Sequence, residues 1–195
     1  MKNISSLHNI HLPGKYGDYE NKNNEKLLKI SEIKNLFLCQ IVKYRNSDFN
    51  ISKVKIDNLS LPSELKTIFN NSTRILWMGP GNWLITSSNK EILKEINDKF
   101  NTKDFAITDL SHSRTIIEIE GDLTYEVIKK GCPLNINYRG EGDCANSVYH
   151  AITITIDFLK NNPKTVRIFS LRSFGESLYE SLTDACLEYG YKAIK

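Results

Sequence analysis

The order of apolar and polar positions predicts alternating strands and helices from about residue 36 onward. Short runs of bulky apolar residues predict strands, and apolar residues at every third or fourth position predict helices. In the first half of the chain the predicted elements are a strand at 36–42, a weaker strand at 54–56, a short helix at 61–69, a hairpin of 74–78 with 83–86, and a helix at 92–100. The Gly/Pro turn at 79–82 supports the hairpin, and Ser88 followed by Glu91 predicts a capping box before the second helix.

The second half of the chain repeats this order of elements. Its predicted elements are a strand at 115–119, a helix at 123–130, a strand at 152–158, a returning strand at 166–171, and a helix at 174–189. Gly131 suits a left-handed end of the first of these helices. Ser173 followed by Glu176 predicts a second capping box. Each half therefore resembles a split β-α-β-β-α unit of a ferredoxin-like layer.

These patterns predict an α+β fold in which two β-α-β-β-α (split ferredoxin-like) repeats pack as one compact body. The half-repeats cover about 36–100 and 105–190, and no Gly/Ser-rich or Pro-rich linker separates them. Residues 1–30 are polar and show no apolar period, so we expect a flexible or partner-ordered arm in front of a domain at 31–195. The sequence leaves open whether this arm is frayed or orders against a partner.

Composition excludes several classes of protein. The chain has 195 residues and 22.4 kDa, which suffices to bury a core without a metal or disulfide. The 26 Lys and Arg residues against 23 acidic residues give a net charge of +3, too small to indicate nucleic-acid binding. No apolar run approaches the ~18 residues of a membrane span, and the N-terminus lacks the apolar core of a secretory signal. We therefore expect a cytoplasmic protein with no membrane partner.

The densest polar cluster is Asp109-Leu110-Ser111-His112-Ser113-Arg114. A serine hydrolase needs its triad assembled in space, with the nucleophile on a sharp strand-to-helix turn such as GxSxG, and that motif is missing here. Asp and Ser commonly bond to nearby backbone groups. We therefore favour a polar strand start in which Asp109 and Ser111 satisfy backbone donors and Arg114 pairs with a carboxylate.

The cysteines do not predict a reactive or metal site. Cys39, Cys132, Cys144 and Cys186 form no CxxC pair and have no His at ligand spacing, so a zinc site is not expected. Cys132 follows a predicted helix C-terminus, where the helix dipole opposes a thiolate, and it precedes Pro133 in a turn. No phosphate-binding glycine motif is present either. The residues alone favour a binding or structural subunit over a free-standing enzyme.

Five segments in order carry a family resemblance. They are Trp77–Leu84, Asp109–Arg114, Lys130–Ile136, Gly142–Ser147 and Leu171–Tyr179. This succession resembles the gamma subunit of heterotetrameric sarcosine oxidase over about 36–190. The first two segments are shared more loosely with the folate-binding aminomethyltransferase-like superfamily. The chain departs from the family pattern at Asn135, Gly175 and Tyr179, where Asp, Ala and Trp are usual.

The resemblance implies a non-catalytic structural subunit of a complex with alpha, beta and delta subunits. That complex oxidises sarcosine to glycine and hydrogen peroxide and passes the one-carbon unit to tetrahydrofolate. The flavins FAD and FMN, NAD, zinc and tetrahydrofolate are then expected on the other subunits, with no catalytic, cofactor or metal residue in this chain. The candidate interface or structural residues are Asp109, Ser111, His112, Arg114, Cys132, Pro133, Cys144, Arg172 and Phe174.

The resemblance also leaves an alternative of another class. A tetrahydrofolate-binding, aminomethyltransferase-like module could act in its own right. It would need polar groups for the pterin and the glutamate tail, for which Asp109 and Arg114 are the best candidates.

Overall fold

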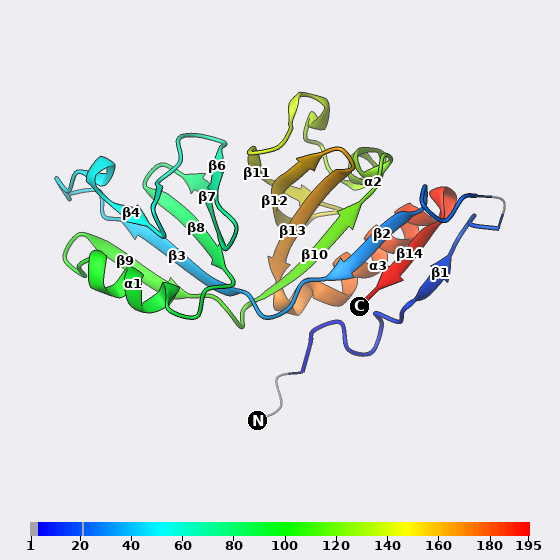
Figure 1. Cartoon of the computed structure of the whole chain (residues 1–195), viewed down its shortest axis with the longest axis horizontal. Coiled ribbons are helices and arrows are strands. Elements are labelled where there is room, and N and C mark those ends of the chain that lie inside the picture. The colour runs from blue at the N-terminus through cyan, green and yellow to red at the C-terminus, as the bar shows by residue number, and fades with distance from the viewer. Residues whose placement is uncertain (1–3, 21) are drawn as a thin grey trace. The chain divides into compact units, whose positions relative to one another are not determined.

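The structure is a computed structural model that describes residues 4–20 and 22–195. It is a mixed α+β protein built mostly of sheet (Figure 1). The described chain divides into two compact units. Unit 1 contains the described residues up to 34 together with 114–141 and 146–195, and unit 2 contains 35–113 with 142–145. No helix of the described residues is long and apolar enough to cross a membrane.

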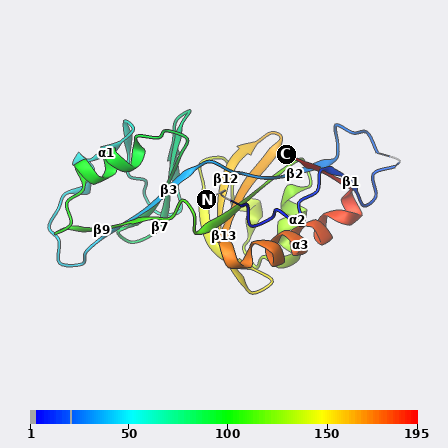
Figure 2. The same ribbon diagram turned by 90° about the horizontal axis from the view of Figure 1, so that it is seen from below.

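Unit 1 is built on a seven-stranded sheet. Its strands are β1 (Gly14–Tyr16), β2 (Leu28–Glu32), β10 (Arg114–Glu120), β11 (Cys144–Tyr149), β12 (Ile152–Asn161), β13 (Lys164–Leu171) and β14 (Tyr191–Ile194). Their order is β1-β14-β2-β10-β13-β12-β11, and β14 runs parallel to β2. The helices α2 (Thr124–Gly131) and α3 (Gly175–Cys186) contact each other and both pack on β13. Figure 2 shows them on the same side of the sheet.

The core of unit 1 lies between this sheet and the two helices. Period-2 apolar residues of the strands meet period-3.6 apolar residues of the helices, as a two-layer fold requires. The fully buried members include Ile117, Ile119, Ile156, Ile168, Val127, Ile128, Leu178 and Leu182. The predicted strands and helices of the second half are confirmed in type and order.

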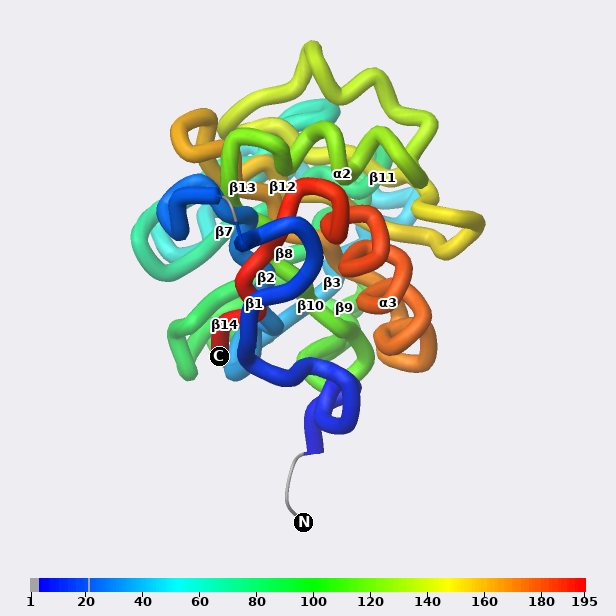
Figure 3. The backbone as a smooth tube through the Cα atoms, turned by 90° about the vertical axis from the view of Figure 1, so that its right-hand side faces the viewer, coloured from blue at the N-terminus to red at the C-terminus, as the bar shows by residue number. Residues whose placement is uncertain are grey.

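The described part of residues 1–30 packs on unit 1 rather than standing apart as an arm. Leu7, Leu27 and Leu28 are buried, and β1 pairs with β14 at the C-terminal end of the chain (Figure 3). These isolated apolar residues fill sites supplied by the rest of the unit, so they leave no periodic signal in the sequence. Residues 1–3 of this segment, and residue 21, lie outside the described residues.

Unit 2 is built on a five-stranded antiparallel sheet. Its strands are β3 (Phe37–Lys43), β6 (Thr67–Phe69), β7 (Thr73–Gly79), β8 (Asn82–Ser87) and β9 (Phe105–Asp109), in the order β6-β7-β8-β3-β9. A small ribbon joins β4 (Lys55–Ile56) to β5 (Leu59–Ser60). Helix α1 (Ile92–Lys99) packs on β3 and contributes Ile92 and Ile96 to the core. The predicted hairpin is confirmed as β7 and β8, with Gly81 at a positive φ of 68° in its turn.

The predicted helix at 61–69 is wrong. Thr67–Phe69 forms the strand β6 beside β7, and Leu65 has a left-handed φ of 59° that no helix contains. The Thr67 N–H donates to the carbonyl of Gly142 (2.8 Å), a partner distant in sequence. The prediction also missed β9, which ends on exposed polar residues. The first half therefore lacks the strand-helix-hairpin-helix order, and the predicted twofold repeat is not confirmed.

Two details of helix ends also differ from the sequence prediction. The predicted capping boxes do not form, because α1 and α3 have N-cap residues Glu91 and Phe174 without a side-chain cap hydrogen bond. The predicted left-handed end at Gly131 is also wrong, since Gly131 is the last residue of α2. A Cβ atom on Gly131 would lie 2.7 Å from the Tyr149 ring. Close packing against Tyr149, not a positive φ, requires glycine there.

Candidate functional site

The polar segment after β9 is a locally bonded turn in unit 2. The Asp109 carboxylate accepts hydrogen bonds from the Ser111 N–H (2.9 Å) and from Ser111 Oγ (2.6 Å). These two bonds hold the pKa of Asp109 below its usual value. Ser111 Oγ in turn accepts from the Leu38 N–H at the start of β3 (3.0 Å). Asp109 and Ser111 therefore tie the end of β9 to the neighbouring strand.

This geometry does not resemble an activated serine. A serine nucleophile needs an imidazole to accept its hydroxyl proton. The Ser111 hydroxyl donates to the Asp109 carboxylate, while His112 lies exposed in the next position. The polar groups of this segment therefore stabilise the fold. The Ser111 hydroxyl donates its hydrogen bond to a carboxylate whose pKa is lowered.

The four cysteines are buried, free thiols. Cys39 on β3 lies opposite Asp109 on β9. Burial, together with the Asp109 charge, raises the pKa of Cys39 to about 11. Burial likewise raises the pKa of Cys186 to about 12. The thiolate is the nucleophilic and metal-binding form, so these two residues are protonated and unreactive at neutral pH.

The other two thiols make polar contacts inside the protein. Cys132 Sγ donates to Ser147 Oγ (3.3 Å), and Pro133 follows it on the surface. Cys144 Sγ lies 3.2 Å and 3.3 Å from the carbonyl oxygens of Lys66 and Trp77. Across residues 4–20 and 22–195, no group of three or more His, Cys, Asp or Glu side chains is arranged to hold a metal ion.

Three candidate residues meet at one end of the unit 1 sheet. Arg114 opens β10 opposite Leu171 on β13, and burial lowers the pKa of its guanidinium. Arg172 follows Leu171 and donates to the carbonyl of Ile4. Phe174 follows at 47% exposure. The nine candidates are therefore spread over several places in the two units, and no two of them form a nucleophile–base pair in the described contacts.

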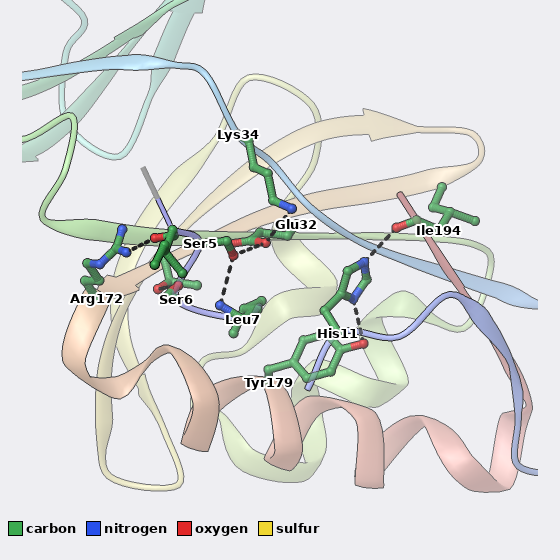
Figure 4. A network of polar contacts seen from close by, with 11 residues as sticks. Ser5, Ser6, Leu7, His11, Glu32, Lys34, Arg172, Tyr179 and Ile194 are labelled. Atoms are coloured by element: carbon green, nitrogen blue, oxygen red, sulfur yellow. Dashed lines mark hydrogen bonds and ion pairs between the residues drawn. The ribbon is translucent and has the colours of Figure 1, made fainter. Parts of the chain in front are cut away.

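A network of side chains fastens residues 4–7 to unit 1 (Figure 4). Ser5 Oγ donates to the Glu32 carboxylate, which also pairs with Lys34 (3.1 Å). Ser6 Oγ bonds to Thr115 Oγ1 (2.6 Å) on β10. Leu7, which follows them, is fully buried. The segment is therefore held by polar bonds next to an apolar anchor.

His11 fastens the next part of the same segment. Its Nε2 lies 2.8 Å from the Ile194 carbonyl and its Nδ1 lies 2.8 Å from the Tyr179 hydroxyl (Figure 4). A carbonyl can only accept, so Nε2 carries the proton, and in the neutral ring Nδ1 accepts from Tyr179. Burial raises the pKa of Tyr179, which keeps its hydroxyl a donor. One imidazole thereby joins α3 to β14.

A shallow pocket lies beside His11. Its volume is about 310 Å³, and its walls come from the N-terminal segment, α3 and β14. The Tyr16 hydroxyl donates to the Leu12 carbonyl (3.0 Å), and the Tyr179 hydroxyl is bonded to His11. These two hydroxyls on its walls are thus already engaged by the protein.

Sequence reasoning missed the residue with the most exposed aromatic ring. Tyr138 ends a 3-10 turn, Ile136–Tyr138, and is 83% exposed. The signal was a Tyr-Arg pair within the polar, glycine-containing stretch 135–142. No apolar period there calls for an aromatic residue in the core, so its presence points to the surface.

Comparison with known proteins finds no matching family model. Two curated proteins, both named sarcosine oxidase subunit gamma, match part of the chain. The one from Corynebacterium sp. (strain U-96) is 25% identical over 120 residues, covering 61% of this chain and 58% of the relative. The one from Corynebacterium sp. (strain P-1) is 27% identical over 128 residues, covering 63% of this chain and 61% of the relative. The resemblance to sarcosine oxidase gamma subunits is confirmed. The matched region spans about three-fifths of the length of these relatives.

Solved structures extend the likeness in fold. A chain of the heterotetrameric sarcosine oxidase from Corynebacterium sp. U-96 matches with a TM-score of 0.76 at 20% identity, covering 86% of this chain and 87% of that chain. Aminomethyltransferase T of the glycine cleavage system from Bartonella henselae matches with a TM-score of 0.57 at 11% identity, covering 80% of this chain and 45% of that chain. The α+β fold therefore resembles that of a sarcosine oxidase chain and, more distantly, the aminomethyltransferase fold.

Proposed function

We propose that this chain is the non-catalytic gamma subunit of a heterotetrameric sarcosine oxidase. The observation that carries the proposal is the fold match, which covers 86% of this chain and 87% of a chain of that enzyme. Two relatives named as gamma subunits support it from the sequence side. In this role the chain contributes surface and rigidity to an oxidoreductase whose chemistry lies on other subunits.

The chemistry of the candidate site supports a structural role. The Ser111 hydroxyl donates a hydrogen bond to the Asp109 carboxylate, and burial keeps Cys39 and Cys186 in the thiol form. Catalysis by such groups would require an adjacent base or a lowered thiol pKa. The contacts of Asp109 and Ser111 join β9 to β3, and Cys39 and Cys186 are buried, so we assign these residues to fold stability.

The partners and cofactors follow from the family resemblance. We propose alpha, beta and delta subunits as partners in the cytoplasm, with FAD, FMN, NAD, zinc and tetrahydrofolate bound by them. The complex would oxidise sarcosine and pass the one-carbon unit to tetrahydrofolate. Arg114, Arg172 and Phe174 share one end of the unit 1 sheet and remain candidates for contacts with these partners, since Arg is enriched at interfaces.

Co-expression with the alpha, beta and delta subunits of the same organism tests the proposal. We expect all four chains to elute together from a gel-filtration column and to give a single tetramer mass by native mass spectrometry. The proposal is overturned when the other three chains assemble and oxidise sarcosine at full rate while this chain elutes alone.

The fold match to aminomethyltransferase T favours one second candidate. In that case the chain would bind tetrahydrofolate itself and act in methylene transfer. Calorimetric titration of the purified chain with tetrahydrofolate separates the two functions. A structural subunit gives no saturable heat, whereas a folate-binding module gives a saturable isotherm that Asp109→Asn or Arg114→Gln weakens.

A further inference from the structure

Three tyrosine rings line the pocket beside His11. Tyr16 on β1 and Tyr191 on β14 are register partners, and their rings stack with centroids 5.2 Å apart and 23° between their planes. Tyr179 extends from α3 toward the N-terminal segment (Figure 4). Three elements of unit 1 therefore bring aromatic rings to one space of about 310 Å³. This volume is at the lower end of the range of small-molecule pockets, ~300–1,000 Å³.

The rings are fixed before any ligand binds. The Tyr16 hydroxyl donates to the Leu12 carbonyl (3.0 Å), and the Tyr179 hydroxyl bonds to His11 Nδ1 (2.8 Å). Burial raises the pKa of both Tyr179 and Tyr191, so these phenols stay neutral at physiological pH. Rings that are already held in one position lose little freedom when a ligand binds, which favours affinity.

The charge at the pocket is negative. Among the described residues that line it, only Glu180 is charged, and this side chain is exposed on α3. The other two charged residues of α3, Glu176 and Asp184, are acidic as well. No ion pair within the described part of the chain involves Glu180. The pocket therefore attracts a cation.

The lysines of β1 and β14 lie on the opposite face of the sheet. Lys15 and Lys192 pair with each other at the position next to Tyr16 and Tyr191, and successive side chains of a strand point to opposite faces. Both lysines are exposed, whereas Tyr191 is 6% exposed. These two cations therefore lie away from Glu180 and leave the pocket negative.

These features favour one class of ligand, a small quaternary ammonium ion. The face of an aromatic ring is negative, so it attracts the cation and packs against its methyl groups. A quaternary nitrogen carries no N–H group, so it needs no set of hydrogen-bond acceptors on entering the pocket. A primary ammonium has three N–H donors to satisfy, and a metal ion requires several oxygen ligands. The wall offers one carboxylate, which balances the charge of a quaternary ion.

We propose that this pocket binds a small quaternary ammonium ion of the choline type. The trimethylammonium group lies against the rings of Tyr16, Tyr179 and Tyr191, and the Glu180 carboxylate balances its charge. The pocket is built from unit 1 alone, so binding needs no partner subunit. This binding goes beyond the proposed structural role and does not depend on it.

Titration of the full chain with choline chloride tests this site. The tyrosine ring signals in the NMR spectrum are followed at constant ionic strength, and the titration is repeated with the neutral analogue in which a tert-butyl group replaces the trimethylammonium group. We expect choline to saturate with a dissociation constant below ~10 mM and the neutral analogue to bind at least ~5-fold more weakly. A response to choline that is still linear at ~10 mM, or a smaller difference between the two ligands, overturns the proposal.

Substitutions on the pocket wall locate the site. Tyr16→Leu removes one ring and should weaken choline binding at least ~3-fold, whereas Tyr16→Phe keeps the ring and should stay within about twofold of the unchanged chain. Glu180→Gln should weaken binding at least ~3-fold and flatten its salt dependence, because an ion pair is screened by salt. The matched control is Glu176→Gln, one turn earlier on α3 and exposed. It should bind choline within about twofold of the unchanged chain.

The melting temperature of each variant separates a loss of binding from a loss of folding. Glu180→Gln changes an exposed side chain and should melt with the unchanged chain, so it decides the test even where Tyr16→Leu loosens the fold. A Glu180→Gln chain that binds choline as tightly as the unchanged chain overturns the proposal. Neither result bears on assembly with the alpha, beta and delta subunits, which is measured separately.

Discussion

Gly175, the first residue of α3, sits where a side chain does not fit. A Cβ atom there would lie 2.4 Å from Thr115 Oγ1 and 3.1 Å from Ser6 Oγ. Those two oxygens are bonded to each other at 2.6 Å, and Thr115 is buried on β10. Gly175→Ala therefore forces Thr115 to move and breaks its bond to Ser6. Alanine at this position should therefore destabilise the chain.

The magnitude follows from three opposing effects. Overfilling a packed site costs about 1–3 kcal/mol, and losing the hydroxyl bond adds about 1 kcal/mol. Replacing glycine by alanine in a helix gains at most about 1 kcal/mol. The net destabilisation is about 2 kcal/mol. For a chain of this length that lowers the melting temperature by about 4–8 °C.

Thermal unfolding followed by circular dichroism measures this change. Ser177→Ala on the exposed face of α3 is the control, and it should leave the melting temperature within about 2 °C. In a Thr115→Ala background the closest obstructing atom, Thr115 Oγ1, is gone while Thr115 Cβ and Ser6 Oγ remain at 3.1 Å, so adding Gly175→Ala should cost about 1 kcal/mol less than it does in the unchanged chain. A Gly175→Ala chain as stable as the unchanged protein, or costs that simply add in the double variant, would refute the steric argument.

Three further changes test other contacts of the site. Tyr179→Phe removes the hydrogen-bond donor to His11 and should lower the free energy of unfolding in urea by about 1 kcal/mol. An unchanged urea midpoint would contradict a stabilising role of the bond between His11 and Tyr179. Ser111→Ala should raise the pKa of Asp109 part of the way toward its usual value in a carboxyl NMR titration, since the Ser111 hydroxyl supplies the larger of the two bonds that lower it; an unmoved pKa would point to another cause. The raised pKa of Cys39, about 11 in the folded chain, means that its contribution to stability is full below the unfolded pKa of about 8.5 and is lost as pH rises through 11. As the pH is raised, the urea midpoint of Cys39→Ala should therefore fall less than that of the unchanged chain. An equal fall would exclude ionisation of Cys39 as a cause of the alkaline loss of stability.

Local signals in the sequence predicted part of the fold. The hairpin of β7 and β8 follows from apolar runs on either side of a turn containing Gly79 and Gly81, and both glycines adopt positive φ. The strands and helices of the second half follow from clear periods of two and 3.6. Each of these features is set by residues within a few positions of one another.

Features that depend on distant partners could not be predicted this way. Thr67–Phe69 is a strand because Gly142 and β7 supply its hydrogen bonds. His11 is held by Tyr179 and Ile194, near the other end of the chain. The sequence shows that position 138 is a tyrosine, but the exposure of its side chain depends on the burial of Ile136 in the fold. The candidate interface residues were chosen from short sequence motifs. No pattern in the sequence could show that these motifs would lie at separate places in the two units.

Sarcosine-dependent hydrogen peroxide formation measures whether the chain has a structural role in this enzyme. The assay compares the isolated chain with added FAD, the three-subunit complex without it, and that complex after the chain is added back. We expect no turnover by the isolated chain. On its addition to the complex, we expect the rate, or the half-life of activity, to rise and to level off at one chain per complex. Peroxide formation by the isolated chain, or no response of the complex to its addition, would contradict a structural role in this enzyme.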